Sequence, residues 1–350
     1  MQGNAAAREN GRDAMFDNLK GILMVLVVYA HVYDNLGVQY GWLNWLRVGL
    51  LMVLMPLFLF ISGYFGKKLE KRRAGTLEGC LLPFLIFNTL FYLASLPFGG
   101  GFTYNLLTPL KMYWFLVALM LYRLLLPELS KIRGLFVISI VVALIVGVDP
   151  NVGRVLSLSR AICFFPFYLM GIYCSKERMD KLRRTPPALA IGLFVACTAA
   201  GVLLGNAFDA LSPSNSHHPY HMVNCYWDQS LNFADVGGPV MRASLYVLAP
   251  LMCLVFLSCT RSKEGIFTAI GRNSMAVYLF HAFPQFILDW VVRDILHIEF
   301  SGVIGLVIML AYSYIVARIL AVQKITDAYN KVMDRLNAAV FRSKEAAAVK

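Results

Sequence analysis

Ionisable side chains stand inside the first long apolar stretch of the sequence. Lys20 and His31 lie eleven residues apart within FDNLKGILMVLVVYAH, at residues 16–31. Eleven helical steps of about 100° return to within about 20° of the starting direction, so the two side chains share one helix face, about 16 Å apart along the axis. Asp17 and Asp34 fall on the same side of that helix. In a helix surrounded by lipid, such residues indicate a functional site.

The chemistry open to this stripe is proton transfer. A neutral imidazole at His31 could act as a general base, and Asp34 could fix its tautomer and stabilise its charged form. The alternatives are that His31 only hydrogen-bonds a neighbouring helix and that Asp34 lies at the outer surface.

A second row of polar side chains on one helix face begins at His281. Gln285 and Asp289 follow at i+4 and i+8 and therefore share its helix face. We expect a polar path between this helix and the first one. The predicted catalytic residues are His31, Asp34 and His281.

The composition indicates which class of protein contains these two rows of polar side chains. Of 350 residues, 59% are apolar and only 15% are charged, with a mean hydropathy of +0.63. These values exclude a soluble globular protein and a disordered chain. The net charge of +12 resides largely in a few short loops, so we expect it to face a lipid bilayer rather than a nucleic acid.

The predicted fold class is all-α, a polytopic membrane helix bundle. A spanning helix needs roughly 17 to 25 apolar residues. About ten such runs occur, at residues 19–37, 48–65, 79–98, 112–127, 134–149, 160–175, 187–205, 240–259, 269–292 and 302–321.

The basic residues of the loops predict the orientation. Across ten crossings, 24 Lys and Arg fall on the side of the termini and 5 on the other, which places both termini in the cytoplasm. The expected organisation is a cytoplasmic segment at 1–18, a membrane domain at 19–321 and a cytoplasmic tail at 322–350. The expected location is the plasma (inner) membrane.

The longest outside loop, at 206–239, is rich in histidine, amide and aromatic side chains. Tyr226 and Trp227 could stack on a sugar, or they could anchor the loop at the membrane interface. The seven cysteines show no metal-ligand spacing, so no metal site is expected.

Several segments of the chain form a series whose order and spacing are more specific than any one of them. They are FDNLKGILMVLVVYAH, MPLFLFISGYFGKK, LLPFLIFN, YWFLVALMLYRLL, RAICFFPFYLMGIY and IGRNSMAVYLFHAF. With this series the chain resembles the acyltransferase family three membrane proteins, especially the branch described as fucose 4-O-acetylase-like, over nearly all of residues 15–320. In that family a basic residue, ten residues and then a histidine mark the first helix, and Lys20 and His31 fit this pattern.

The resemblance implies transfer of an acyl group, usually acetyl from acetyl-CoA, to a hydroxyl of a carbohydrate outside the cytoplasm. The acceptor would be a carbohydrate or a lipid-linked glycan, and His31 would be the catalytic histidine. A transporter or exporter that uses a His/Asp proton relay is the alternative function. The sequence makes no prediction of oligomeric state.

Basic residues are the candidates for holding the substrates. Family members commonly carry Arg-x-x-Arg near the third helix, whereas this chain has adjacent Arg72 and Arg73 in GKKLEKRRAGTLE. Together with Lys20 they could bind the phosphates of acetyl-CoA, or they could only set the topology. Arg123 and Arg160 could hold the acceptor or the thioester oxygen, or they could extend to the membrane surface.

Overall fold

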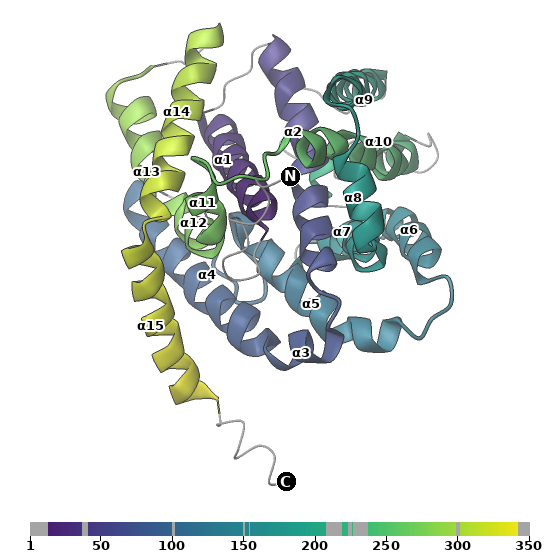
Figure 1. The fold of residues 1–350 in the computed structure, drawn as a ribbon. Helices are drawn as coiled ribbons and strands as arrows, with labels where there is room; N and C mark the ends of the chain where they lie inside the picture. The colour runs from purple at the N-terminus through teal and green to yellow at the C-terminus, as the bar shows by residue number, and fades with distance from the viewer. Residues whose placement is uncertain are drawn as a thin grey trace.

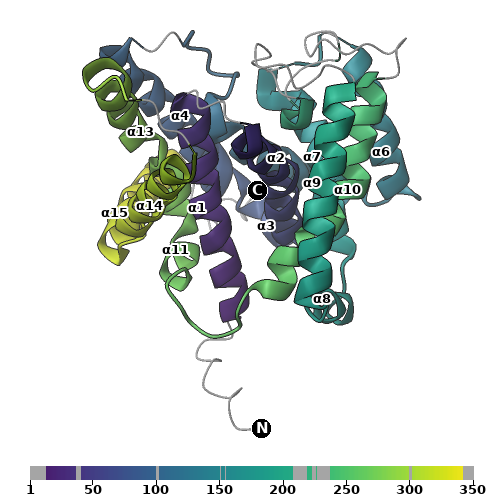
Figure 2. The same ribbon diagram turned by 90° about the horizontal axis from the view of Figure 1, so that it is seen from above.

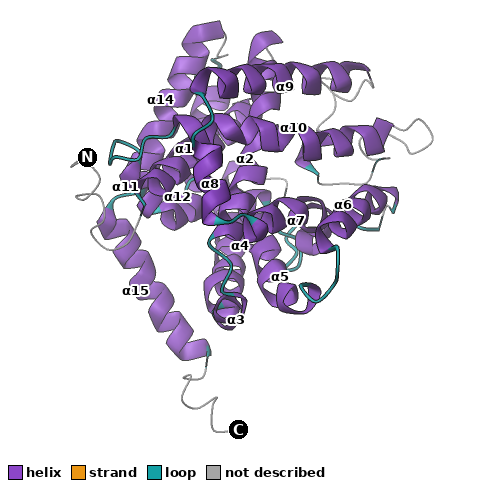
Figure 3. Cartoon of the chain, turned by 45° about the vertical axis from the view of Figure 1, so that its right-hand side comes forward, coloured by secondary structure: helices purple, strands orange, loops and turns teal. Residues whose placement is uncertain are grey.

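The computed structural model describes residues 13–36, 41–99, 102–149, 151–153, 155–207, 219–222, 226, 237–298 and 302–341. All regular structure in these ranges is helical, which confirms the all-α prediction (Figures 1 and 3). Nine helical segments there are long and apolar enough to span a membrane. They are Ala14–Leu36, Trp42–Tyr64, Leu77–Phe98, Lys111–Leu129, Val155–Tyr173, Pro187–Ala207, Gly237–Cys259, Ser274–Ile295 and Gly302–Leu320.

The element bounds within and between these spans are as follows. The main helices are α1 (Ala14–Leu36), α2 (Gly41–Tyr64), α4 (Leu82–Ser95), α5 (Trp114–Leu129), α7 (Leu158–Tyr173), α9 (Pro187–Ala207), α10 (Gly237–Cys259) and α14 (Gly302–Leu320). Shorter or connecting helices are α3 (Leu69–Ala74), α6 (Leu135–Ile145), α8 (Lys176–Arg183), α11 (Thr268–Arg272), α12 (Ser274–Phe280) and α13 (Ala282–Asp289). The C-terminal α15 (Gln323–Val340) projects away from the bundle (Figures 1 and 3).

The predicted span at 134–149 is the one that falls short. Its helical residues, Leu135–Val148, number fewer than the eighteen of a candidate span. Fourteen residues rise only about 21 Å, against a hydrocarbon core of about 30 Å. This segment is therefore a short apolar helix packed against α7 and α10, and the count of full-length spans in the described chain is nine instead of ten.

α1 and α2 form the centre of the bundle. α1 packs against α2, α11 and α14, whereas α2 packs against α7, α9 and α10. Figure 2 shows α1 and α2 side by side, with α4, α13 and α14 on one flank and α6, α9 and α10 on the other. The face of α1 that carries Lys20 and His31 is thus surrounded by protein.

The ninth predicted span is interrupted, which corrects the regular helix expected from its sequence. It consists of α12, α13 and a π-helix, η9 (Trp290–Ile295). Pro284 has no N–H to donate to the carbonyl of Phe280, which explains the break after that residue. His281 lies at this break, and π-helical turns such as η9 are frequent at functional sites.

Candidate active site

A cavity of about 250 Å³, the first cavity, extends along α1. Its α1 lining is Lys20, Met24, Val27, Ala30, His31 and Asp34; all but Ala30, which precedes His31 directly, recur every three or four residues on one helix face. From Lys20 to Asp34 this face rises about 21 Å. The other walls come chiefly from α2, α5, α7 and α12. Apart from His31 in its wall, the cavity is mainly apolar between its charged ends.

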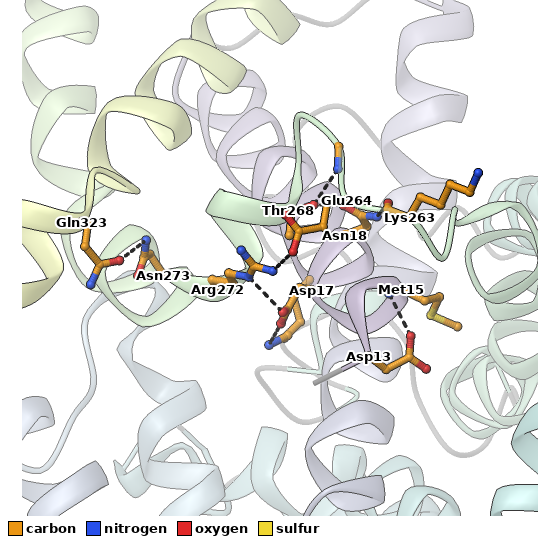
Figure 4. Close-up of polar contacts among 12 residues, drawn as sticks. Asp13, Met15, Asp17, Asn18, Lys263, Glu264, Thr268, Arg272, Asn273 and Gln323 are labelled. Carbon is orange, nitrogen blue, oxygen red and sulfur yellow. Dashed lines mark hydrogen bonds and ion pairs between the residues drawn. The ribbon is translucent and has the colours of Figure 1, made fainter. Parts of the chain in front are cut away.

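The Lys20 end of the first cavity is held by a network of polar side chains (Figure 4). Asp17, only 4% exposed, lies 2.9 Å from the Lys20 ammonium and 3.6 Å from Nε of Arg272. Asn18 donates to the carbonyls of Arg261 and Lys263 at 2.9 and 2.7 Å, and Thr268 donates to the Asn18 carbonyl at 2.6 Å. The network therefore fixes the start of α1 against the segment that enters α11.

The backbones of α1 and α11 also touch at this end. A Cβ added at Gly271 would lie 1.7 Å from the carbonyl oxygen of Asp17, and one added at Gly21 would lie 2.1 Å from that of Phe267. Only glycine permits such an approach at both positions. These contacts fix the height of Lys20 relative to Arg272.

Arg160 and Asp34 lie at the opposite end of the first cavity. Arg160 donates through Nε to the carbonyl of His221 at 3.0 Å, and its guanidinium lies 4.9 Å from the centre of the Trp114 ring. The Asp34 carboxylate accepts a hydrogen bond from Arg47 at 2.5 Å. The structure thus pairs Asp34 with an arginine of α2 and gives His31 a different neighbour.

That neighbour is His281, whose ring centre lies 5.5 Å from the ring centre of His31. His281 is fully buried, and its Nδ1 lies 3.1 and 2.8 Å from the carbonyl oxygens of Val277 and Tyr278. Since a carbonyl can only accept, Nδ1 carries the hydrogen and Nε2 of the neutral ring is an acceptor. Nε2 has no hydrogen-bond partner among the described residues. The break in the helix therefore presents a fixed tautomer beside His31.

A second cavity, of about 330 Å³, adjoins His31 on the α13 side. Its polar lining includes Asn35, Lys111, Gln285, Asp289, Arg293 and Asp294. Asn35 connects three of them: it donates to Gln285 Oε1 at 3.5 Å and accepts from Lys111 at 3.3 Å, and its carbonyl accepts from Arg293 at 3.3 Å. Because His31 lines both cavities, its imidazole can be reached from two directions.

Three of the predicted arginines lie elsewhere. Arg72 and Arg73 are exposed on α3, and Arg72 donates to the carbonyl of Phe65. Arg123 contacts the Cys80 sulfur at 3.1 Å. None of these three lines either cavity.

The long loop contains the two aromatic residues that were predicted to stack on a sugar, Tyr226 and Trp227. Tyr226 is buried beneath Arg242, whose guanidinium lies 4.6 Å from its ring centre, and it too lies outside both cavities. Trp227 lies outside the described residues. The structure therefore gives Tyr226 a packing environment against α10.

Several residues of the site went unpredicted. Asn35 follows His31 by four residues and so shares its face, a signal that the sequence did contain. Lys111 and Arg293 counted in the sequence only among the five basic residues of the outer side, because nothing local shows that these two positions, far apart in sequence, meet above α1. Within the described chain, no group of His, Cys, Asp and Glu could hold a metal ion.

Comparison with known proteins places this geometry in context. The family model described as an acyltransferase domain, that of acyltransferase family 3, matches residues 13–322. The nodulation protein NolL of Mesorhizobium japonicum is 30% identical over 303 residues, which cover 79% of this chain and 78% of that protein. NolL of Sinorhizobium fredii is 41% identical over 68 residues, or 18% of each chain. No solved structure matches.

Proposed function

The chain belongs to acyltransferase family 3 and is a membrane acyltransferase, and we propose that it moves acetyl from cytoplasmic acetyl-CoA to a hydroxyl of a carbohydrate across the membrane. The acceptor is an extracytoplasmic or lipid-linked glycan, and the enzyme resides in the plasma membrane. The single observation that carries the proposal is the first cavity, which leads from Lys20 to His31 along one face of α1.

The shape and polarity of the first cavity suit the donor. Acetyl-CoA has anionic phosphates at one end, a flexible arm and a thioester at the other. Lys20 lines the cavity and provides a positive charge for the phosphates at the end predicted to be cytoplasmic. Arg272, which is bound to Asp17 and Glu264, lies beside this end. The apolar walls accommodate the arm, and the thioester reaches His31.

His31 can promote the transfer in two ways. As a general base, it takes the proton from the acceptor hydroxyl while the hydroxyl oxygen attacks the thioester carbonyl, the C–S bond breaks and the CoA thiolate receives the proton. As a nucleophile, its nitrogen attacks the thioester carbonyl and the C–S bond breaks, which releases the CoA thiolate. The hydroxyl oxygen then attacks the acetyl group, the C–N bond to His31 breaks, and the hydroxyl proton passes to the thiolate. In both cases, Nε2 of His281 can accept a hydrogen bond from the N–H of His31 and so orient the His31 ring.

The proposed direction of transfer depends on the orientation of the bundle. In a background with Cys225 and Cys259 replaced by serine, we expect Leu106→Cys to react with an impermeant thiol reagent on intact cells, because residue 106 is exposed in the predicted outer loop. Ala74→Cys should react only after permeabilisation. The reverse pattern would contradict donor access from the cytoplasm.

Purified protein in detergent provides the direct test of activity. Without a carbohydrate present, water takes the place of the acceptor hydroxyl, so we expect the protein to hydrolyse acetyl-CoA to acetate and CoA. We expect His31→Ala to abolish this reaction while retaining the wild-type elution profile. Equal CoA release by both proteins would contradict the proposal. A transporter would consume no acetyl-CoA in this assay.

A further inference from the structure

We propose that the second cavity is the acceptor site and that it binds an uncharged, polyhydroxylated sugar ring through Gln285 and Asp289. This inference rests on the proposed function and adds to it the place and the chemical class of the acceptor. It concerns the side of His31 opposite to the donor.

Two polar atoms of the broken helix carry the argument. Nε2 of Gln285 and Oδ1 of Asp289 are buried and have no hydrogen-bond partner among the described residues. Gln285 is only 4% exposed. Buried polar groups are nearly always hydrogen-bonded, and both residues are on α13 and line the second cavity. A bound ligand would satisfy them.

The two atoms specify the kind of ligand. Gln285 Nε2 donates and Asp289 Oδ1 accepts. A donor beside an acceptor suits neighbouring hydroxyl groups, because each hydroxyl can both donate and accept. A phosphate or a carboxylate could satisfy only the donor.

The charges of the cavity also favour an uncharged ligand. Lys111 and Arg293 are balanced by Asp289 and Asp294 in the lining. An anionic ligand would meet the two carboxylates, and a cationic ligand would meet the two basic groups. The lining therefore offers no net charge to attract an ion of either sign.

Aromatic rings provide the remaining part of a sugar site. Phe98 and Phe286 lie parallel, with ring centres 5.9 Å apart, and Trp290 lies 6.3 Å from Phe98. All three line the second cavity, and Phe98 and Trp290 are exposed. The apolar C–H face of a sugar packs well on such rings, while its hydroxyl edge faces α13 and His31.

Protection of an engineered cysteine tests this site even though the natural acceptor is unidentified. Ala282→Cys places a thiol in the lining of the second cavity with a minimal change of volume, in the Cys225→Ser, Cys259→Ser background. The reagent is methanethiosulfonate ethyltrimethylammonium, added to intact cells. The probes are the methyl glycosides of glucose, galactose, mannose and fucose, each tested alone, and glucuronate.

We expect at least one methyl glycoside to slow the labelling of the thiol at position 282 by fivefold or more, with no protection by glucuronate. Leu106→Cys, which lines neither cavity, should be labelled at the same rate with every probe. Absence of protection by all four glycosides, equal protection by glucuronate, or a thiol that never reacts would each overturn the proposal.

A second variant links protection to the named residues. Asp289→Ala removes the accepting oxygen, and we expect it to abolish the protection at position 282. Asp327→Ala on α15, where the carboxylate accepts from Gln323, is the matched control and should retain protection. Protection unchanged by Asp289→Ala would remove Asp289 from the site.

The two proposals can fail separately. If purified protein consumes acetyl-CoA but no glycoside protects the thiol at position 282, the acceptor site is wrong and the acyltransferase proposal stands. If glycosides protect this thiol but no acetyl-CoA is consumed, the sugar site stands and the donor assignment is wrong.

Discussion

The two ends of α1 carry similar polar residues but satisfy them differently. At the Lys20 end, the side-chain oxygen and both amide hydrogens of Asn18 have partners, and Asp17 lies between two cations. Oδ2 of Asp17 accepts no hydrogen bond among the described residues, but it lies 3.6 Å from Nε of Arg272. Beyond His31, the unpartnered buried atoms of Gln285 and Asp289 line a cavity. The polar contacts of the first end therefore hold helices together, whereas those of the second end leave groups available to the proposed acceptor.

The largest effect should come from His31, which lines both cavities. We expect His31→Ala and His31→Gln to reduce acyl transfer by a factor of about 10²–10⁴, the typical contribution of general acid–base catalysis. Stability should fall by only about 1 kcal/mol, the scale of a lost hydrogen bond between membrane helices. CoA release and thermal unfolding in detergent measure the two quantities. Substantial activity in His31→Gln would show that hydrogen bonding alone suffices.

At the Lys20 end of α1, substitutions should lower the stability of the fold instead of the rate of acyl transfer. A methyl group at Gly271 would overlap the carbonyl of Asp17, so we expect Gly271→Ala to cost about 1–3 kcal/mol, as overpacking typically does. The melting temperature in detergent measures this loss. Gly265→Ala, in the same segment but with no atom within 4 Å of the added Cβ, is the matched control. Equal melting temperatures for the two variants would contradict the close contact of α1 and α11.

The sequence predicted the fold well because membrane helices are specified locally. Each span needs a run of apolar residues, and nine of the ten predicted runs are helices of sufficient length. The exception, at 134–149, has the composition of a span but too few helical residues. The break at His281 was also missed, although Pro284 was visible, because a proline in a membrane helix does not by itself show where the hydrogen bonding fails.

The site was predictable only along a single helix. The spacing of Lys20 and His31 sufficed to place both on one cavity wall. Whether His31 meets His281 depends on how two helices far apart in sequence pack, and a local pattern does not contain this information. For the same reason, the sequence could not divide the basic residues into those near the cavity, such as Arg272, and those remote from it, such as Arg123.

Replacing Lys20 should have a smaller effect, limited to the binding of acetyl-CoA. Charge-assisted hydrogen bonds are worth about 1.5–3 kcal/mol, so we expect Lys20→Gln to raise the KM for acetyl-CoA by about tenfold or more. The kcat should change comparatively little, as for a loss of uniform binding. Asp17 would still have Arg272 at 3.6 Å, so the start of α1 should remain fixed. Lys20→Arg, which keeps the charge, should recover most of the affinity, and a raised acceptor KM instead would move Lys20 to the acceptor side.

The smallest effect should come from replacing Arg72 and Arg73, which were predicted from the sequence to bind the phosphates of acetyl-CoA together with Lys20. Both are exposed on α3, and neither lines the first cavity. An exposed charge outside the cavity is screened by water and salt over about 8–10 Å. We therefore expect the double variant Arg72→Gln, Arg73→Gln to change the KM for acetyl-CoA by less than about twofold, once labelling at position 74 confirms that its orientation is unchanged. A tenfold rise in a correctly oriented protein would place the CoA phosphates at α3, and the donor would then enter beside α5 instead of along the Lys20 face of α1.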